Sequence, residues 1–187
     1  MITPATGILI TANILLFLME TARGGSTNKD TALRFGALYT PLVKKGQWYR
    51  LFTSMFLHFG FLHLFCNMFS LYNLGPALET LFGAPVFAAL YLASGLAGNV
   101  LTYIKESRSG QYSLSAGASG AVFGLLGAYL VFALWPGISG VSLYGVLRVL
   151  AINAVYTISN RSINAAAHFG GLACGAVITA LLLFIFT

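Results

Sequence analysis

The sequence predicts an all-α polytopic membrane protein with six transmembrane helices. Hydrophobic residues make up 58% of the 187 residues, charged residues make up 7%, and the mean hydropathy is +0.84. A soluble domain carries roughly 25% charged residues because its surface faces water. The apolar residues also form long continuous runs rather than a two-residue alternation, which favours helices over a membrane barrel. Most of the surface is therefore expected to face lipid.

The apolar runs place the six helices within one domain covering residues 1–187. In hydrocarbon every backbone N–H and C=O needs an internal partner, and a helix of about 20 residues provides it while crossing. The predicted spans are residues 6–20, part of 56–82, 85–104, 119–134, 143–158 and 165–186. No basic region precedes the first span, and the acidic Glu20 follows its apolar stretch, so we expect no cleaved signal peptide. No polar tail follows the last, so we expect flanking residues to have been removed. Cys66 and Cys174 are expected to be small buried thiols, with a disulfide as the alternative.

The first loop, residues 21–50, is long for so small a chain. Its second half, residues 35–48, mixes aromatic residues with Lys44 and Lys45, a composition typical of a segment in the membrane interface. An ordinary solvated loop is the alternative. The net charge of +6 comes mainly from loop residues beside the spans. Lipid headgroups of the bilayer are therefore the expected partners of these charges, and no nucleic acid is expected.

The scarcity of ionisable residues excludes several chemistries. No glutamate follows any of the three histidines, so a zinc site of the H-E-x-x-H type is absent, and we expect neither a metal nor a cofactor. The single aspartate, Asp30, leaves no pair of aspartates to share a proton. No acidic residue lies in the spans that hold Ser119 and His168, so a Ser-His-Asp triad is not expected. A two-residue nucleophile and base remains.

Ser119 and His168 are the candidates for this pair. Ser119 begins the fourth span, where unpaired N–H groups and the helix dipole favour developing negative charge. His168 lies near the start of the sixth span, and short loops put both starts on one membrane face. A helix cap is the alternative role for Ser119, and packing or proton relay is the alternative for His168.

Other residues could support that chemistry. His63 and Asn67 are four residues apart on one face of the second span, and both can donate hydrogen bonds to a developing oxyanion. His58 is expected to be structural. Small residues that let helices approach closely concentrate in and before the fourth span and in the sixth: Gly117, Gly120, Gly124, Gly127, Gly171 and Gly175. We expect this packing to set the distance between the serine and the histidine.

Four segments together resemble the rhomboid family of intramembrane serine proteases. They are Trp48-Tyr49-Arg50, His63-x-x-x-Asn67, Gly117-Ala118-Ser119-Gly120 and Ala167-His168-x-x-Gly171-x-x-x-Gly175. Their order and spacing cover nearly the whole chain.

The resemblance implies a rhomboid-like bundle with roles for particular residues. Ser119 would be the nucleophile and His168 the base, while His63, Asn67 and the Ser119 N–H would form an oxyanion hole. Phe123 matches an aromatic residue that packs under the histidine; many members have tyrosine there, so one hydrogen bond is lost here. Implied substrates are single-span membrane proteins with small or helix-breaking residues near the cut.

Two arguments about orientation disagree. Loops one, three and five hold nearly all the cations: Arg23, Lys29, Arg34, Lys44, Lys45, Arg50, Lys105, Arg108 and Arg161. The positive-inside rule places this face in the cytoplasm. The resemblance implies the reverse for bacterial members, and we adopt it, expecting a bacterial or archaeal cell membrane.

Two other functions stay open. A catalytically silent relative that binds membrane clients is the alternative, although such proteins typically lose the serine or the histidine. A small transporter or channel is disfavoured by the absence of any carboxylate well inside a predicted span and of a helix repeat.

Overall fold

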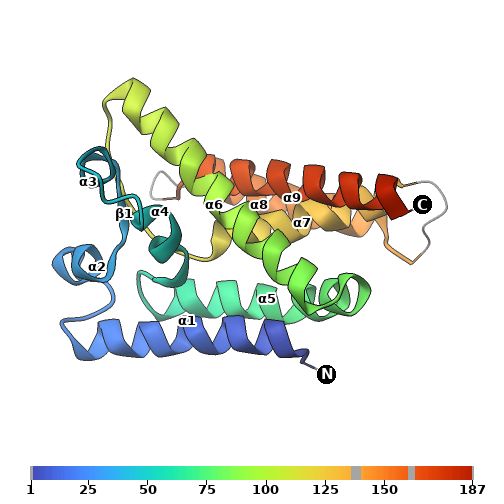
Figure 1. Cartoon of the computed structure of the whole chain (residues 1–187), viewed down its shortest axis with the longest axis horizontal. Helices are drawn as coiled ribbons and strands as arrows, with labels where there is room; N and C mark the ends of the chain where they lie inside the picture. Colours follow the sequence, from blue (N-terminus) through green and yellow to red (C-terminus); the bar gives the residue numbers. More distant parts are fainter. Residues whose placement is uncertain (1, 136–139, 160–162, 187) are drawn as a thin grey trace.

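Six long helices form the body of the protein. The computed structural model describes residues 2–135, 140–159 and 163–186. The long helices are α1 (Pro4–Ala22), α5 (Phe61–Phe82), α6 (Ala84–Ser109), α7 (Ser119–Leu134), α8 (Leu143–Ser159) and α9 (Ala165–Phe186). Each overlaps a predicted helical segment, and α1 lies beside α5 while α7 lies beside α9 (Figure 1). The predicted helical class is confirmed.

Length and composition divide these helices into two groups. Among the described residues, α1, α6 and α9 are each long and apolar enough to cross a membrane. A fourth candidate is the bent pair of Arg50–Phe56 and α5, which meet at 90°. The apolar helices α7 and α8 have 16 and 17 residues. At 1.5 Å per residue they are about 24–26 Å long, slightly less than the hydrocarbon thickness of about 30 Å. The three clear spans make the chain an integral membrane protein.

The first loop is an ordered structure. In the structure this loop, between α1 and α5, runs from residue 23 to residue 60 rather than from 21 to 50. It contains α2 (Lys29–Phe35), β1 (Leu38–Tyr39), α3 (Thr40–Lys44), α4 (Arg50–Thr53) and the 3-10 turn η1 (Ser54–Phe56). The all-α prediction is wrong in one detail, because β1 pairs antiparallel with β2 (Leu114–Ser115). The pairing satisfies loop backbone groups and joins the first loop to the segment that leads into α7.

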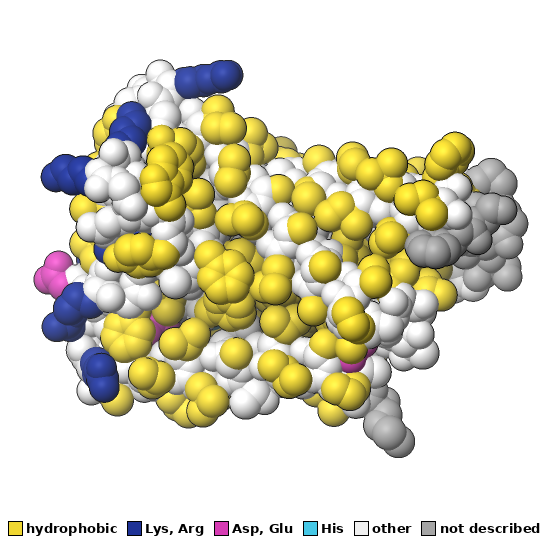
Figure 2. All heavy atoms as spheres, viewed as in Figure 1, with side chains coloured by type: hydrophobic (Ala, Val, Ile, Leu, Met, Phe, Trp, Pro, Cys, Tyr) yellow, Lys and Arg dark blue, Asp and Glu magenta, His cyan; other side chains and the backbone are white. Residues whose placement is uncertain are grey.

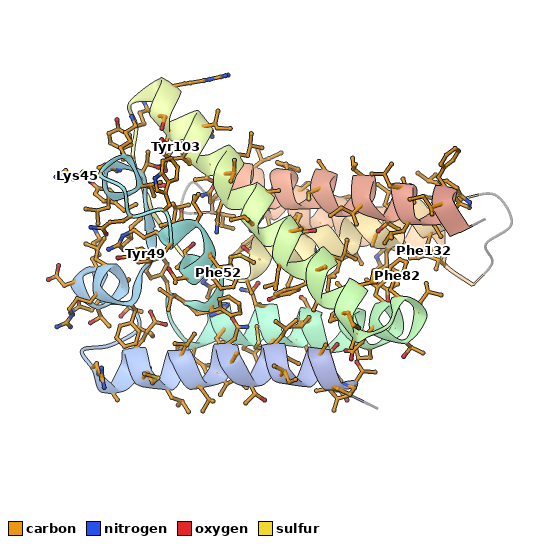
Figure 3. The ribbon with its side chains drawn as sticks, viewed as in Figure 1. Lys45, Tyr49, Phe52, Phe82, Tyr103 and Phe132 are labelled. Atoms are coloured by element: carbon orange, nitrogen blue, oxygen red, sulfur yellow. The ribbon has the colours of Figure 1, made fainter. Side chains whose placement is uncertain are left out.

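Arg50 holds this loop together. Its side chain is only 5% exposed, and its Nη1 donates to the carbonyl oxygens of Leu33 and Ala37, both at 2.9 Å. Its Nε donates to Oε1 of Gln47 at 2.7 Å. The ring of Trp48 packs edge-on against Tyr103 of α6 (Tyr103 is labelled in Figure 3). These contacts tie the parts of the loop to one another and to α6.

Two glutamates near helix ends connect their helices to other parts of the chain. Glu79, near the end of α5, accepts hydrogen bonds at 2.7 Å from the backbone N–H groups of Ala5 and Thr6, and also from the Thr3 hydroxyl. It therefore binds the unpaired N–H groups and the positive dipole end of α1. Glu106, near the end of α6, accepts from the Thr40 hydroxyl at 2.5 Å.

Glycines bring α7 and α9 into backbone contact. A Cβ added to Gly171 would overlap the carbonyl oxygen of Gly120, and one added to Gly175 would overlap that of Gly124. A Cβ on Gly127 would likewise overlap the carbonyl of Leu172. The prediction that small residues let these helices approach closely is confirmed.

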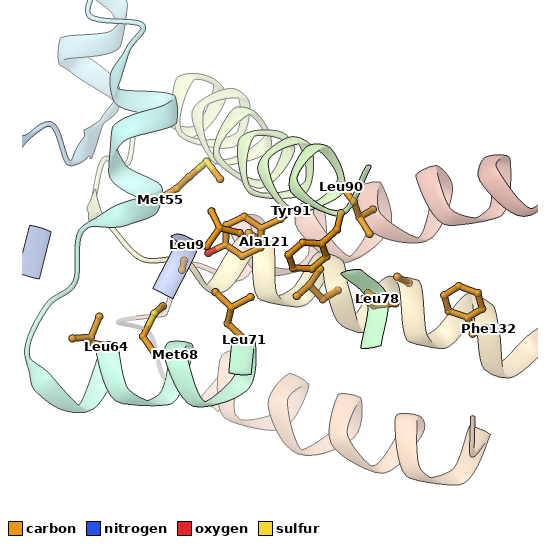
Figure 4. Packing of buried hydrophobic residues seen from close by; sticks show 14 residues of the cluster. Leu9, Met55, Leu64, Met68, Leu71, Leu78, Leu90, Tyr91, Ala121 and Phe132 are labelled. Atoms are coloured by element: carbon orange, nitrogen blue, oxygen red, sulfur yellow. The ribbon is translucent and has the colours of Figure 1, made fainter. Parts of the chain in front are cut away.

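The apolar core lies between α5, α6 and α7, where Leu71, Tyr91 and Ala121 are almost fully buried (Figure 4). Hydrophobic side chains also cover the outer helical surface, while lysines and arginines gather at the end formed by α2 and α3 (Figure 2). The expectation of buried thiols is wrong for Cys66, which is exposed on α5; Cys174 is half-buried, and both are unpaired. An apolar setting does not imply burial when the surrounding solvent is lipid.

Candidate active site

Ser119 is the first residue of α7, and the segment before it is firmly anchored. The N–H of Gly117 donates to the carbonyl of Ser54 at 2.9 Å, and the N–H of Ala118 donates to Nε2 of His58 at 3.4 Å. Ala118 is the N-cap residue, and no side chain caps the helix. The helix-cap role for Ser119 is therefore wrong.

His168 lies in the first turn of α9 and is anchored from the residue that precedes the helix. Oδ1 of Asn164 accepts from the N–H of Ala167 at 3.1 Å, as an N-cap side chain does. Nδ2 of Asn164 donates to the Ser115 hydroxyl at 2.9 Å, which ties the start of α9 to the strand before Ser119. His168 itself is buried.

These two anchored helix starts bring the serine and histidine together. Nε2 of His168 lies 2.8 Å from Oγ of Ser119, within hydrogen-bond distance. The ring of Phe123, one turn along α7, stacks on the imidazole with centroids 4.1 Å apart and planes at 19°. The stacking holds the ring plane, so the geometry lets Nε2 receive a proton from the Ser119 hydroxyl.

The second ring nitrogen of His168 has a partner that the sequence did not indicate. Nδ1 lies 2.9 Å from Oγ1 of Thr157, a buried residue near the end of α8. Helix packing and the stacked Phe123 ring are therefore not the only contacts of the His168 imidazole. Thr157 stands in an ordinary apolar stretch, and no motif or spacing distinguishes it from other helical threonines.

His63 and Asn67 lie at the edge of the same site. The imidazole of His63 borders Gly117: a Cβ there would be 2.7 Å from Cε1 of His63 and 3.7 Å from Oγ of Ser119. Gly117 also has φ of +136°, a conformation that favours glycine. The missing side chain thus lets the His63 ring lie directly against the backbone of Gly117, two residues before Ser119.

Asn67 makes a local bond in this state. Its Nδ2 donates to the carbonyl of His63 at 2.9 Å, and the residue is buried. An amide has two N–H donors, so one remains for another acceptor. None of the hydrogen bonds found among the described residues joins His63 or Asn67 to Ser119 or His168.

His58 is buried behind these groups. Its ring lies 5.1 Å from that of His63 in an edge-on arrangement, and its backbone N–H donates to Oε2 of Glu20 at 3.2 Å. Together with the bond from Ala118, these contacts give His58 a supporting place in the site.

Within the part of the chain that the structure describes, no three histidine, cysteine or acidic residues cluster closely enough to hold a metal ion. The groups that meet at the site are a hydroxyl, an imidazole and potential hydrogen-bond donors.

The chain is similar in sequence to a known protein family and to several known proteins. A family model for the Rhomboid domain matches residues 45–184. The chain is 36% identical over 172 residues to Rhomboid protease GluP of Bacillus subtilis, covering 91% of this chain and 33% of that protein. It is 38% identical to RHOMBOID-like protein 5 of Arabidopsis thaliana, covering 78% of this chain and 47% of the relative. Rhomboid-like protease 1 of Toxoplasma gondii is 35% identical, with 76% and 50% covered.

This chain therefore spans between a third and a half of the length of these three relatives. The family match covers residues 45–184, which include all four segments that carry the resemblance, from Trp48 to Gly175. The chain belongs to the rhomboid family.

Proposed function

We propose that this protein is an intramembrane serine endopeptidase that hydrolyses peptide bonds in or near transmembrane helices of other membrane proteins. The observation that carries the proposal is the 2.8 Å contact between Oγ of Ser119 and Nε2 of His168. A serine is a weak nucleophile at its own pKa, and an adjacent base activates it. The names of relatives, including Rhomboid protease GluP of Bacillus subtilis, support the same class of reaction.

The reaction would proceed through an acyl-enzyme. Oγ of Ser119 attacks the scissile carbonyl while Nε2 of His168 takes the hydroxyl proton, and the carbonyl oxygen becomes negative. The backbone N–H of Ser119 at the start of α7, the His63 ring and the free N–H of Asn67 would donate to that oxyanion. His168 then gives the proton to the leaving amine, and water hydrolyses the ester with His168 again as base. None of these reaction steps requires a metal or a cofactor.

The same proposal specifies the membrane arrangement. All six long helices would cross the bilayer as one protease domain, with the shorter α7 inside the bundle, the shorter α8 on its lipid-facing side and α2 to α4 in the interface. The active site would open to the face that bears the first loop. We place that face outside the cell membrane of a bacterium or archaeon, as the family resemblance implies.

The proposed substrates are single-span membrane proteins. A helix hides each carbonyl in an i to i−4 hydrogen bond, so the chain must unwind before Ser119 can attack. Glycine and proline weaken a helix, by about 1 and 3 kcal/mol relative to alanine. Segments with such residues are the expected cleavage sites.

Reconstituted protein tests the proposal directly. Wild type in lipid vesicles, incubated with a labelled single-span substrate, should release two fragments whose masses locate one cut. Ser119→Ala should release none, whereas Ser70→Ala, which changes a half-buried serine on α5 whose hydroxyl bonds to the carbonyl of Cys66, should cleave like wild type. Binding of the substrate by wild type without any cleavage would instead support a silent, client-binding relative.

A further inference from the structure

Thr157 of α8 is the residue from which a further inference follows, and this inference rests on the proposed function. We infer that Thr157 is a positioning residue of the active site: its hydroxyl accepts the Nδ1–H of His168 and so selects the tautomer that can act as a base. The juxtaposition is a distance of 2.9 Å between Oγ1 of Thr157 and Nδ1 of His168. Because Thr157 belongs to α8, the seating of this helix would control whether His168 is competent.

The direction of the Thr157 hydroxyl is the first argument. Threonines in membrane helices usually donate a hydrogen bond to a backbone carbonyl of their own helix. Three threonines of this protein do so: Thr21 to Phe17, Thr80 to Pro76 and Thr102 to Gly98. The hydrogen bond found for Thr157 crosses instead to another helix and ends on a ring nitrogen. A hydrogen bond within α8 therefore does not explain where the Thr157 hydroxyl lies.

Burial is the second argument. Thr157 is 3% exposed and is the only fully buried residue of α8, whose residues are all described. Its neighbours Tyr156 and Ile158 are 62% and 71% exposed and face outward. The helix thus directs one polar group into the protein, and that group meets His168.

Proton placement is the third argument. A neutral imidazole carries one proton, on either Nδ1 or Nε2. Nε2 can accept the Ser119 proton only if the ring proton is on Nδ1. An acceptor beside Nδ1 favours that tautomer, and a hydroxyl oxygen provides one without placing a charged carboxylate in the membrane. The opposite tautomer would present an N–H to Ser119 and could not activate it.

The consequence is a link between α8 and catalysis. Ser119 and His168 sit on α7 and α9, whose backbones touch through glycines. Thr157 sits on a helix that contributes a single fully buried side chain. A displacement of α8 would remove the Nδ1 acceptor while leaving the distance between serine and histidine unchanged.

The test uses three variants of the whole chain. Thr157→Val keeps the β-branched shape and removes the acceptor, whereas Thr157→Ser keeps the hydroxyl. Thr179→Val is the matched control, because Thr179 of α9 is also buried but its hydroxyl has no hydrogen-bond partner among the described residues. Each protein is reconstituted in vesicles, and kcat and KM are measured for a single-span substrate.

Thr157→Val should lower kcat by roughly 3–10-fold with KM within about twofold, the effect of one neutral hydrogen bond on a rate. Thr157→Ser should recover most of the rate, and Thr179→Val should match wild type. Equal kcat for wild type and Thr157→Val would overturn the inference. So would an equal loss in Thr179→Val, since that would be a general packing effect.

Nitrogen NMR of labelled histidine side chains provides a readout that does not depend on cleavage. His168 is assigned by the signal lost in His168→Ala. Wild type should show the Nδ1–H tautomer, and Thr157→Val should show a mixture of the two. A wild-type Nε2–H tautomer, or an unchanged tautomer in Thr157→Val, would contradict the role of Thr157. If wild type cleaves nothing, the proposed function fails, whereas the NMR result still decides the inference.

Discussion

The α7–α9 pair and helix α8 are built in opposite ways, although both reach His168. The pair has backbone contacts at Gly171 and Gly175, where no side chain fits between the helices. Helix α8 faces outward over most of its length and places only Thr157 fully inside. Close backbone packing fixes α7 against α9, and we call these two helices the locked pair. Helix α8 contacts the site through the Thr157 hydroxyl.

The difference suggests a division of labour in the proposed enzyme. The distance between Ser119 and His168 must be constant, because proton transfer requires hydrogen-bond contact. Close packing of glycines provides this constancy, since packed interiors deform little. In the role inferred for Thr157, the tautomer of His168 depends on one hydroxyl contact from a helix that is mostly exposed. The following predictions test that contrast.

The largest effect is expected for the two groups on the locked pair. Ser119→Ala and His168→Ala should each lower the cleavage rate by at least about 10³-fold, because loss of a nucleophile or base in a serine protease costs that much or more. Neither change should unfold the protein, since the glycine contacts between α7 and α9 remain. Cleavage and thermal unfolding, measured on the same vesicle preparations, provide the check. Wild-type cleavage by Ser119→Ala would end the assignment of the nucleophile.

A smaller loss is expected at the proposed oxyanion donors of α5. His63→Ala and Asn67→Ala should each lower kcat by roughly 10²–10³-fold, the typical effect of losing one such donor. Residual activity should persist because the Ser119 N–H and the other side chain remain. Asn73→Ala is the matched control: Asn73 makes the same bond to the fourth preceding residue, at 2.7 Å, but is exposed. Equal losses of kcat in Asn67→Ala and Asn73→Ala would instead indicate that the hydrogen bond to the carbonyl of α5 matters, and not a bond to the oxyanion.

Separating the locked helices should also impair the site without touching substrate. Gly171→Leu would force side-chain atoms into the carbonyl of Gly120, so α9 must move and the serine–histidine contact must lengthen. Labelling of Ser119 by a fluorophosphonate probe, which needs an activated hydroxyl, should slow by about 10²-fold, comparable with losing one donor.

Val177→Leu provides the control for this helix. It adds bulk on the lipid-facing side of α9, where Val177 is exposed, and should label at the wild-type rate. Full-speed labelling of Gly171→Leu would show that helix packing does not set the geometry of the pair.

The sequence predicted the bounds of the helices better than it predicted which residues contact one another. The bounds of α7 and α9 equal the predicted 119–134 and 165–186, because apolar runs and loop residues mark both ends. Helix α6 was predicted to end at residue 104, yet it continues to Ser109 because polar residues there extend the helix beyond the apolar run. Gly110, with φ of +71°, then ends it.

Two features of the site region had no sequence signal. Two-residue strands such as β1 and β2 are too short to show alternation, so only the structure reveals their pairing. Which way the Thr157 hydroxyl points depends on the seating of α8, and a single threonine in an apolar helix is common. The residues in motifs, Ser119 and His168 among them, were found because their neighbours and spacing are unusual.

The smallest expected effect lies on the outward face of α8. Ile158 follows Thr157 directly and is 71% exposed, so Ile158→Ala removes contacts with lipid rather than with the protein. We expect kcat within about twofold of wild type, as for surface changes away from special features. Measured beside Thr157→Val in the same vesicles, this variant separates the hydroxyl from the rest of the helix. A loss in Ile158→Ala as large as that in Thr157→Val would mean that the outer face of α8 itself contacts substrate during the reaction. The contrast between a locked pair and a helix attached through one hydroxyl would then have to be abandoned, because α8 would act along its whole length.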